Sequence, residues 1–287
     1  MAKGRELVGR IKTTENTRKI TRTLEMVATS KMKRAVDRVV AARPYATALS
    51  DVISRLYSPE LATVFPLLRQ PEREKRAAVI VMTANRGLAG AFNSNLIREA
   101  RLLVARLEDA GTQVDLHMMG RKGIGFFKYV GRTMVAQRTD ISDRPTAEDA
   151  ASLVDGPMAA FAAGEIDAVY LVHASFKSVV SSPATAVKIL PVTPPSAQAG
   201  AKDYLLYPSA EGILGDLLPA YVRNAVYRAL VETFAGFYST QRTAMKNATD
   251  NAGEMLTVLR RTYNRARQAN ITQEIAEIVG GASALQG

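Results

Sequence analysis

At 287 residues the chain is long enough for one or two domains, and its 38 Lys and Arg against 27 Asp and Glu leave a net charge of +11. That excess points to an acidic partner, which can be nucleic acid, a membrane surface or acidic protein loops. The absence of cysteine excludes disulfides and thiolate catalysis. No apolar run approaches the roughly 20 residues of a membrane span, so we expect no direct membrane insertion.

The first predicted element is a long helix over residues 1–57. Between Arg5 and Tyr57 the only proline is Pro44. Small and apolar residues recur at alternating spacings of three and four, which is typical of a helix that packs along another helix. The repeat consists of Leu7, Ile11, Thr14, Thr21, Leu24, Ala28, Ala35, Val39, Ala42, Ala46, Leu49, Ile53 and Leu56.

Residues 58–76 are predicted to be a linker, and residues 77–192 an α/β domain. Short apolar segments alternate there with helical ones, which is typical of a mostly parallel sheet with helices on both faces. We therefore expect a Rossmann-like insert of about five strands. The expected strands are 77–83, 114–119, 133–137, 166–174 and 184–190; the expected helices are 93–110, 121–130 and 146–163, the last capped by Thr146 and Asp149.

A second linker is predicted at 193–219 and a second long helix at 220–287, since no proline follows Pro219. The two long helices can pair only if everything between them is an insert. We expect an antiparallel coiled coil interrupted by the α/β domain, with an alanine-rich, partly polar seam that favours close backbone approach. The predicted seam is Leu230, Phe234, Phe237, Gln241, Ala244, Ala248, Ala252 or Asn251, Met255, Leu259, Thr262, Ala266 and Ala269.

No complete catalytic or cofactor site is visible. The glycine-containing turn 83–90 could cradle a phosphate, but it matches neither the dinucleotide fingerprint nor the P-loop, which favours a structural turn or a protein contact. Glu274 and Glu277 lie three residues apart on a helix without a convergent partner. The two histidines, His117 and His173, fall in predicted strands and are expected to be core or edge residues.

Two other patterns suggest interaction. The basic cluster of the first helix is either a solvated face or a contact for acidic protein loops; it comprises Arg18, Lys19, Arg22, Lys31, Lys33 and Arg34. Residues 246–252 and 268–274 place amides and hydroxyls where a helix tolerates Glu and Lys better, which suggests specific contacts.

Several runs resemble the gamma subunit of the F-type, rotary and proton-translocating ATP synthase along the whole chain. The opening helix contributes Glu25-Met26-Val27-Ala28 and Ser30-Lys31-Met32, and the insert contributes Arg86-Gly87-Leu88 with Gly90 and Phe92-Asn93. The last helix contributes Met245-Lys246, Ala248-Thr249-Asp250-Asn251, Tyr263-Asn264, Ala266-Arg267-Gln268-Ala269, Ile271-Thr272 and Gly281-Ala282. Arg242 stands one place later than the arginine that the family usually has before the Met-Lys motif.

The resemblance implies a central shaft that carries torque between a membrane rotor ring and three catalytic beta subunits, and that has no catalytic residue and no cofactor of its own. It implies one copy per complex, within a ring of three alpha and three beta subunits, in contact with an epsilon subunit and the c-ring. It places the chain peripherally on the cytoplasmic face of the bacterial inner membrane. By the same resemblance, Gln268, Thr272 and Arg267 face Arg18, Lys19 and Met26 in contact with the catalytic ring, together with Arg242, and the turn with Arg86, Gly87 and Gly90 belongs to the rotor foot.

An alternative of a different class is a stand-alone basic coiled-coil protein that binds nucleic acid. It predicts binding with a steep salt dependence. The aromatic residues lie mainly on apolar faces and do not interleave with arginine as stacking platforms would, and the resemblance implies no nucleic-acid partner.

Overall fold

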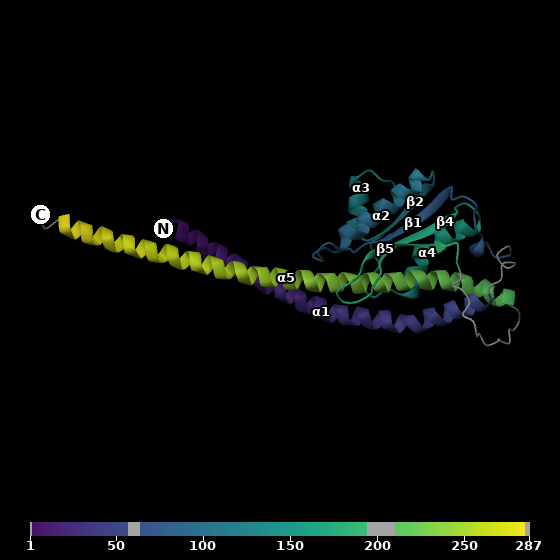
Figure 1. Ribbon diagram of the computed structural model, residues 1–287, viewed down its shortest axis with the longest axis horizontal. Helices are drawn as coiled ribbons and strands as arrows, with labels where there is room; N and C mark the ends of the chain where they lie inside the picture. Colours follow the sequence, from purple (N-terminus) through teal and green to yellow (C-terminus); the bar gives the residue numbers. More distant parts are fainter. Residues whose placement is uncertain (1, 57–63, 194–209, 285–287) are drawn as a thin grey trace. The chain divides into compact units, whose positions relative to one another are not determined.

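The computed structural model describes residues 2–56, 64–193 and 210–284, which divide into two compact units (Figure 1). Residues Thr29–Thr240 form the first, called here the α/β unit. Residues Met1–Ala28 and Gln241–Gly287 form the second, called here the helical unit. The long helices α1 (Ala2–Leu56) and α5 (Ala210–Ala284) each contribute to both units.

The α/β unit contains one 5-stranded sheet in the order β3-β2-β1-β4-β5. β1 pairs in parallel with β2 and β4, β2 pairs in parallel with β3, and β5 joins β4 as an antiparallel edge strand. The predicted mostly parallel sheet between two long helices is thus confirmed. The remaining elements are η2 Pro66–Leu68, β1 Arg76–Met82, α2 Phe92–Asp109, β2 Gln113–Met119, α3 Arg121–Tyr129, β3 Ala136–Arg138, α4 Ala147–Ala162, β4 Ala168–Ala174 and β5 Ala184–Leu190.

Both faces of the central strand β1 are buried, as its continuous apolar sequence predicts. Val79 and Val81 pack on the face covered by α2 and α3. Ile80 and Met82 pack on the opposite face with α4 and with the parts of α1 and α5 that belong to the α/β unit. The insert therefore shares its core with the two long helices, which fixes it to them.

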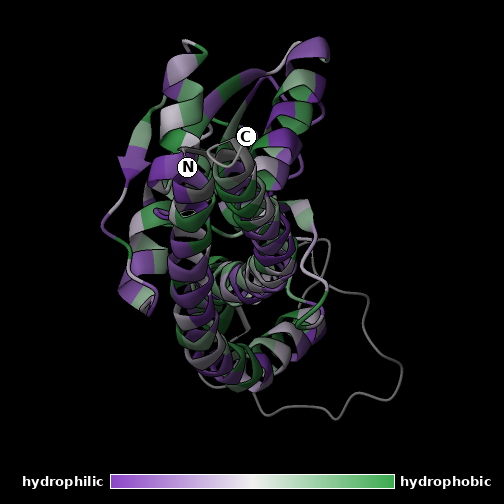
Figure 2. Cartoon of the chain, turned by 90° about the vertical axis from the view of Figure 1, so that its left-hand side faces the viewer, coloured by the Kyte–Doolittle hydropathy of each residue, from purple (hydrophilic) through white to green (hydrophobic). Residues whose placement is uncertain are grey.

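The predicted repeat of α1 is the buried side of the helix in the α/β unit. Its members Ala35, Val39, Ala46, Leu49 and Ile53 are all buried. Figure 2 shows hydrophilic and hydrophobic residues alternating along the long helices. The repeat therefore predicted the packed face of α1 correctly.

The second linker is shorter than predicted, because α5 begins at Ala210 and continues through Pro219. A proline inside a helix costs about 3 kcal/mol. Leu214, Leu218 and Val222 flank Pro219 on the buried side of the helix, at 0–1% exposure. Full burial of a side chain of this kind contributes about 1.5–3 kcal/mol, so the three together outweigh the cost of the proline.

The third strand also differs from the prediction of 133–137. β3 covers only Ala136–Arg138, because it pairs with no more than the last three residues of β2, His117–Met119. The helix α4 follows the prediction closely. Thr146 caps it, accepting from the Asp149 backbone while the Asp149 carboxylate accepts from the Thr146 backbone. Residues 58–63 and 194–209 of the two predicted linkers lie outside the described residues, as does residue 57 at the end of the predicted first helix.

Candidate contact sites of the two units

The two helices of the helical unit run antiparallel, and a buried hydroxyl pair fixes their register. Thr21 Oγ1 and Thr249 Oγ1 lie 2.8 Å apart, and each hydroxyl is also bonded to a carbonyl of its own helix. Since each hydroxyl has one proton, one donates across the pair and the other donates along its own helix. An ion pair of 2.6 Å between Arg260 and Glu15 agrees with the same register. A buried polar pair of this kind specifies the alignment of a coiled coil.

The seam of α5 in the helical unit agrees with the predicted one only in part: Ala252 was predicted and is buried, and Met255 contacts Thr14 of α1, but Met245, Thr249 and Leu256 were not predicted. Met245, Thr249, Ala252 and Leu256 are buried, whereas the predicted Met255 is 57% exposed. Small or apolar residues stand at both of the neighbouring positions, so the pattern fits either choice. Only the partner helix decides between them.

Two of the predicted contact residues, Arg18 and Lys19, lie on one basic groove of the helical unit. The guanidinium of Arg18 crosses Gly253, where an added Cβ would come within 3.7 Å of its Nε. Basic side chains dominate the groove, which suits an acidic partner. It is lined by Glu15, Arg18, Lys19, Arg22, Leu256 and Arg260.

Met26 and Arg242 are placed differently from each other. Met26 is 59% exposed, which leaves a large apolar side chain available for a partner. Arg242 is half-buried, and its Nε finds no hydrogen-bond partner among the described residues. An unpaired buried donor is costly. The contact of Arg242 with the catalytic ring stays a prediction.

Arg267, Gln268 and Thr272 are exposed, but the expectation that they face Arg18, Lys19 and Met26 is wrong. The two helices α1 and α5 run in opposite directions from the Thr21–Thr249 contact. One step from Thr21 toward the start of α1 therefore corresponds to one step from Thr249 toward the end of α5. This register places Gln268 opposite the beginning of α1. Thr272 lies beyond that point. The two groups form separate sites on the helical unit.

The turn after β1 is held by asparagine side chains. Asn93 Oδ1 accepts from the Ala84 N–H at 2.9 Å, and Asn93 Nδ2 donates to Arg86 O at 3.2 Å. Asn85 Oδ1 accepts from the Arg121 N–H at 3.0 Å. One backbone donor of the turn, the Ala84 N–H, is thus already engaged, which favours the structural reading of the turn.

The tip of this turn has an unusual backbone. Leu88 has φ of +62° and is 62% exposed, and Gly90 has φ of +51°. A left-handed backbone is uncommon for a leucine, and here it presents an apolar side chain to the surroundings. The turn with Gly87 and Gly90 thus exposes an apolar side chain at its tip, and its place at a rotor foot stays a prediction.

A cluster around Asp143, which the sequence did not predict, joins three segments of the α/β unit. Asp143 Oδ2 accepts from Lys31 Nζ of α1 at 2.7 Å and from the Tyr238 hydroxyl of α5 at 2.5 Å. The Asp143 carbonyl accepts from Arg38 of α1 at 3.0 Å. One residue of the loop between β3 and α4 thus holds both long helices, and we call this cluster the carboxylate clamp.

Electrostatics favour the charged form of the clamp. Burial acts to raise the pKa of Asp143, but the hydrogen bonds from Lys31 and Tyr238 and the charge of Lys31 outweigh it and hold that pKa below its usual range. Burial and the bond to Asp143 raise the pKa of Tyr238. The carboxylate is therefore ionised and the phenol neutral at pH 7, as the hydrogen bonds require.

The described residues contain no group of three metal-ligating side chains, and none of their helices has a stretch apolar and long enough to cross a bilayer. His117 and His173 lie in β2 and β4, as predicted. Glu274 and Glu277 are both exposed on α5.

Comparisons with known proteins match the chain from end to end. The ATP synthase family model matches residues 3–285. A curated ATP synthase gamma chain from Gemmatimonas aurantiaca is 66% identical over 290 residues, covering 100% of both chains. The ATP synthase gamma chain of Frankia casuarinae is 40% identical, covering 98% of this chain and 97% of that relative.

Solved structures agree in fold. A chain of the Euglena gracilis mitochondrial ATP synthase aligns with a TM-score of 0.68 at 16% identity, covering 99% of this chain and 95% of that one. A chain of the Tetrahymena thermophila mitochondrial ATP synthase, from a central stalk and c-ring structure, aligns with a TM-score of 0.62 at 23% identity, covering 80% and 99%. With the full-length family match, these findings show that the chain belongs to the ATP synthase gamma-chain family.

Proposed function

We propose that this chain is the central rotary shaft of an ATP synthase and transmits torque between a proton-driven rotor ring in the membrane and the catalytic sites of the beta subunits. Membership of the gamma-chain family supports the central-stalk role. The structural neighbours come from assemblies whose names include the central stalk, F1 and the c-ring. The α/β unit serves as the foot, and the helical unit serves as the shaft inside the catalytic ring.

The strongest support for this proposal is the exposed apolar surface near the C-terminal end of α5. Counted from the Thr21–Thr249 pair, α5 runs past the beginning of α1, so residues 269–284 have no helical partner within the described part of the pair. The apolar side chains Ile271, Ile275 and Ile278 on this end are 47%, 57% and 71% exposed. An exposed apolar helix end needs a partner, and a sleeve formed by the surrounding subunits supplies one.

The basic groove supplies a second kind of contact. Arg18, Lys19 and Arg22 lie exposed on it and would meet acidic loops of the beta subunits. Exposed ion pairs contribute only about 0–1 kcal/mol each. Contacts of that strength can form and break at every step of a rotation.

The carboxylate clamp provides a path for torque. Lys31, Asp143 and Tyr238 connect the insert to both long helices through short, charge-assisted hydrogen bonds. The shared core of the sheet and the two helices adds a rigid apolar connection. A twist applied to the insert is thereby passed to the helices instead of being lost in a hinge.

The proposed assembly holds one copy of this chain with three alpha and three beta subunits, an epsilon subunit and the c-ring. It lies peripherally on the cytoplasmic face of a bacterial inner membrane. ATP chemistry takes place on the beta subunits, and this chain supplies asymmetry and torque but no catalytic residue. The nucleic-acid alternative has no support in the family match, which assigns the whole chain to the synthase.

Reconstitution tests the proposal. The full chain is expressed with alpha and beta subunits from the same source, and ATP hydrolysis is measured with and without it. We expect one copy to join the ring and switch on multisite hydrolysis. A chain that stays out of the ring and elutes with nucleic acid in a salt-sensitive manner would contradict it.

The exposed end of α5 gives a residue-level test. Changing Gln268→Leu together with Thr272→Val removes two polar groups that we propose touch the ring, so we expect lower ATP turnover with an unchanged unfolding curve of the chain. The conservative pair Gln268→Asn and Thr272→Ser is the control. Unchanged coupled rates in the first variant would remove both positions from the contact site.

A further inference from the structure

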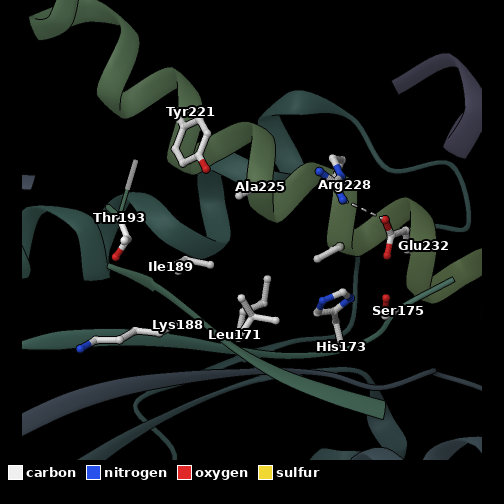
Figure 3. Close-up of a pocket in the computed structure, with 12 residues that line it drawn as sticks. Leu171, His173, Ser175, Lys188, Ile189, Thr193, Tyr221, Ala225, Arg228 and Glu232 are labelled. Atoms are coloured by element: carbon white, nitrogen blue, oxygen red, sulfur yellow. Dashed lines mark hydrogen bonds and ion pairs between the residues drawn. The ribbon is translucent and has the colours of Figure 1, made fainter. Parts of the chain in front are cut away.

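A polar cavity lies inside the α/β unit, between the sheet and α5 (Figure 3), and no part of the shaft function uses it. Its volume is about 320 Å³, at the lower end of the range for small-molecule sites. Both layers contribute side chains that point into it. The lining residues include Leu171, His173 and Ser175 of β4 and its end, Ile189 of β5, and Tyr221, Ala225, Arg228 and Glu232 of α5.

His173 is the first sign that the cavity is built for a ligand. The side chain is only 9% exposed, and its Nδ1 is buried without a hydrogen-bond partner among the described residues. Buried polar atoms are nearly always paired, so an unpaired one that faces a cavity marks a place for a ligand atom. Burial lowers the pKa of His173 and outweighs the charge of Glu232 and the nearby Ala174 backbone, which both act to raise it, so the ring is neutral. The Ala174 backbone is close to the ring but makes no hydrogen bond of good geometry with Nδ1.

Opposite charges stand beside His173 at the same end of the cavity. Glu232 is buried, and its Oε2 is held by the Phe176 N–H at 3.2 Å. Arg228, one helical turn earlier, is half exposed and reaches Glu232 Oε1 at only 3.4 Å. The pair is therefore loose, and a ligand with an ammonium group for Glu232 and a carboxylate for Arg228 would bind both charges better than they bind each other.

The rest of the cavity has a different character. Leu171, Ile189 and Ala225 form an apolar middle section in Figure 3, and the hydroxyls of Tyr221 and Thr193 lie at the far end. Lys188, although it lines the wall, donates to Glu74 at 2.6 Å, so its charge is already engaged. The one loosely held pair of charges is thus at the His173 end.

We infer that this cavity binds a free α-amino acid with a medium-sized apolar side chain. The ammonium group lies against Glu232, the carboxylate against Arg228, and the side chain along Leu171, Ile189 and Ala225. A carboxylate oxygen or the ammonium group completes the hydrogen bonding of His173. The proposed binding goes beyond the shaft function, and the cavity lies between the sheet of the insert and α5.

The chain has two histidines, so the imidazole C2–H resonances of His117 and His173 can be followed separately by NMR in the intact protein. L-Leucine is the probe. We expect it to move the His173 resonance in a saturable way, with half-saturation at or below about 10 mM, the weak end for a ligand of this size. The His117 resonance stays in place.

Two analogues test the zwitterion. 4-Methylpentanoate lacks the ammonium group and 3-methylbutylamine lacks the carboxylate, so each should bind at least about tenfold more weakly than L-leucine. Analogues that bind as well as L-leucine would overturn the assignment of Glu232 and Arg228. The absence of a His173 shift with all three probes would overturn the site itself.

Variants localise the effect. Ala225→Leu fills the apolar middle without touching a charge and should abolish the shift, and Arg228→Gln should weaken it at least tenfold. Arg223→Gln on the same helix removes an exposed partner of Asp155 and is the control, with the affinity of the unaltered chain. Retained affinity in Ala225→Leu, with the fold checked by circular dichroism, would contradict the proposal even if Arg228→Gln unfolds.

Discussion

The carboxylate clamp gives the sharpest stability prediction. Asp143→Ala removes two short hydrogen bonds, from Lys31 at 2.7 Å and from Tyr238 at 2.5 Å. A hydrogen bond to a charged group contributes about 1.5–3 kcal/mol, so the two amount to about 3–6 kcal/mol before water is considered. The side chain of Asp143 is 34% exposed and that of Lys31 is 29% exposed. Water therefore compensates for part of the lost hydrogen bonding, and we expect Asp143→Ala to lower the free energy of unfolding by about 2–4 kcal/mol.

A matched control lies in the same loop. Asp140 pairs with Arg138 at 2.7 Å, and its side chain is 64% exposed. The hydrogen bond from Arg138 lowers the pKa of Asp140 to about 2. Because the pair is solvated, Asp140→Ala should cost no more than about 1 kcal/mol.

The assay is urea unfolding of the full chain, followed by tyrosine fluorescence, since the chain has ten tyrosines and no tryptophan. A double-mutant cycle of Asp143→Ala with Tyr238→Phe should give a coupling energy of about 1 kcal/mol or more. A coupling energy near zero would refute the clamp, as would equal losses for Asp143→Ala and Asp140→Ala.

The clamp also predicts a pH dependence. The pKa of Asp143 is lower in the folded chain than its unfolded value of about 3.9. A lowered carboxyl pKa contributes stability that is present above the unfolded value and lost as the pH falls through the folded one. The difference in unfolding free energy between the unaltered chain and Asp143→Asn should therefore be constant from pH 5 to 7 and shrink below about pH 4.

Two further predictions concern packing and backbone. Leu256→Ala should lower the free energy of unfolding by about 2–4 kcal/mol, because Leu256 is buried in the seam at 4% exposure. Met255→Ala should lower it by less than about 0.5 kcal/mol, because Met255 is 57% exposed. Equal losses in urea unfolding would favour the predicted seam instead. Gly120→Ala should cost at least about 3 kcal/mol or prevent folding, since Gly120 has φ of +95° and an added Cβ would come within 2.1 Å of the Thr83 carbonyl oxygen. Gly125→Ala in α3, where a Cβ meets nothing within 4 Å, should be neutral or stabilising, and a similar loss in both glycine variants would contradict the steric argument.

Much of the fold could be predicted because local pattern and tertiary packing agree. After the exposed Arg76, β1 is apolar from Ala77 to Met82 because both faces are covered, and its six buried residues follow from that. The repeat of α1 was predicted correctly at Val39, Leu49 and Ile53, because these residues continue the three-four spacing and all are buried. The Thr146 cap depends only on residues three apart.

The α5 seam could not be predicted to the residue. Two neighbouring sets of small or apolar residues run along this part of α5. One set contains Ala244, Ala248 and Met255, and the other contains Met245, Thr249 and Leu256. Either set satisfies the three-four spacing, and only the contact of Thr249 with Thr21, 228 residues away, selects one. The mistaken pairing of Gln268 with Arg18 has the same origin, since register is a property of both helices.

The carboxylate clamp was missed for a related reason. Asp143 meets Lys31 across 112 residues and Tyr238 across 95, and no spacing within the chain signals such a contact. Its loop looked like an ordinary polar connection. The exposure of Leu88 at φ +62° could not be predicted either, because leucine rarely adopts a left-handed backbone conformation.

Rotation of the chain inside the catalytic ring can be observed directly. The chain has no cysteine, so Val180→Cys, at a position that is 93% exposed in the α/β unit, gives a single attachment point for a gold rod. With the alpha and beta ring fixed to a surface and ATP supplied, we expect the rod to turn in one direction, pausing three times per revolution for three catalytic sites. A ring that hydrolyses ATP while the rod on a stably bound chain stays still would contradict the account.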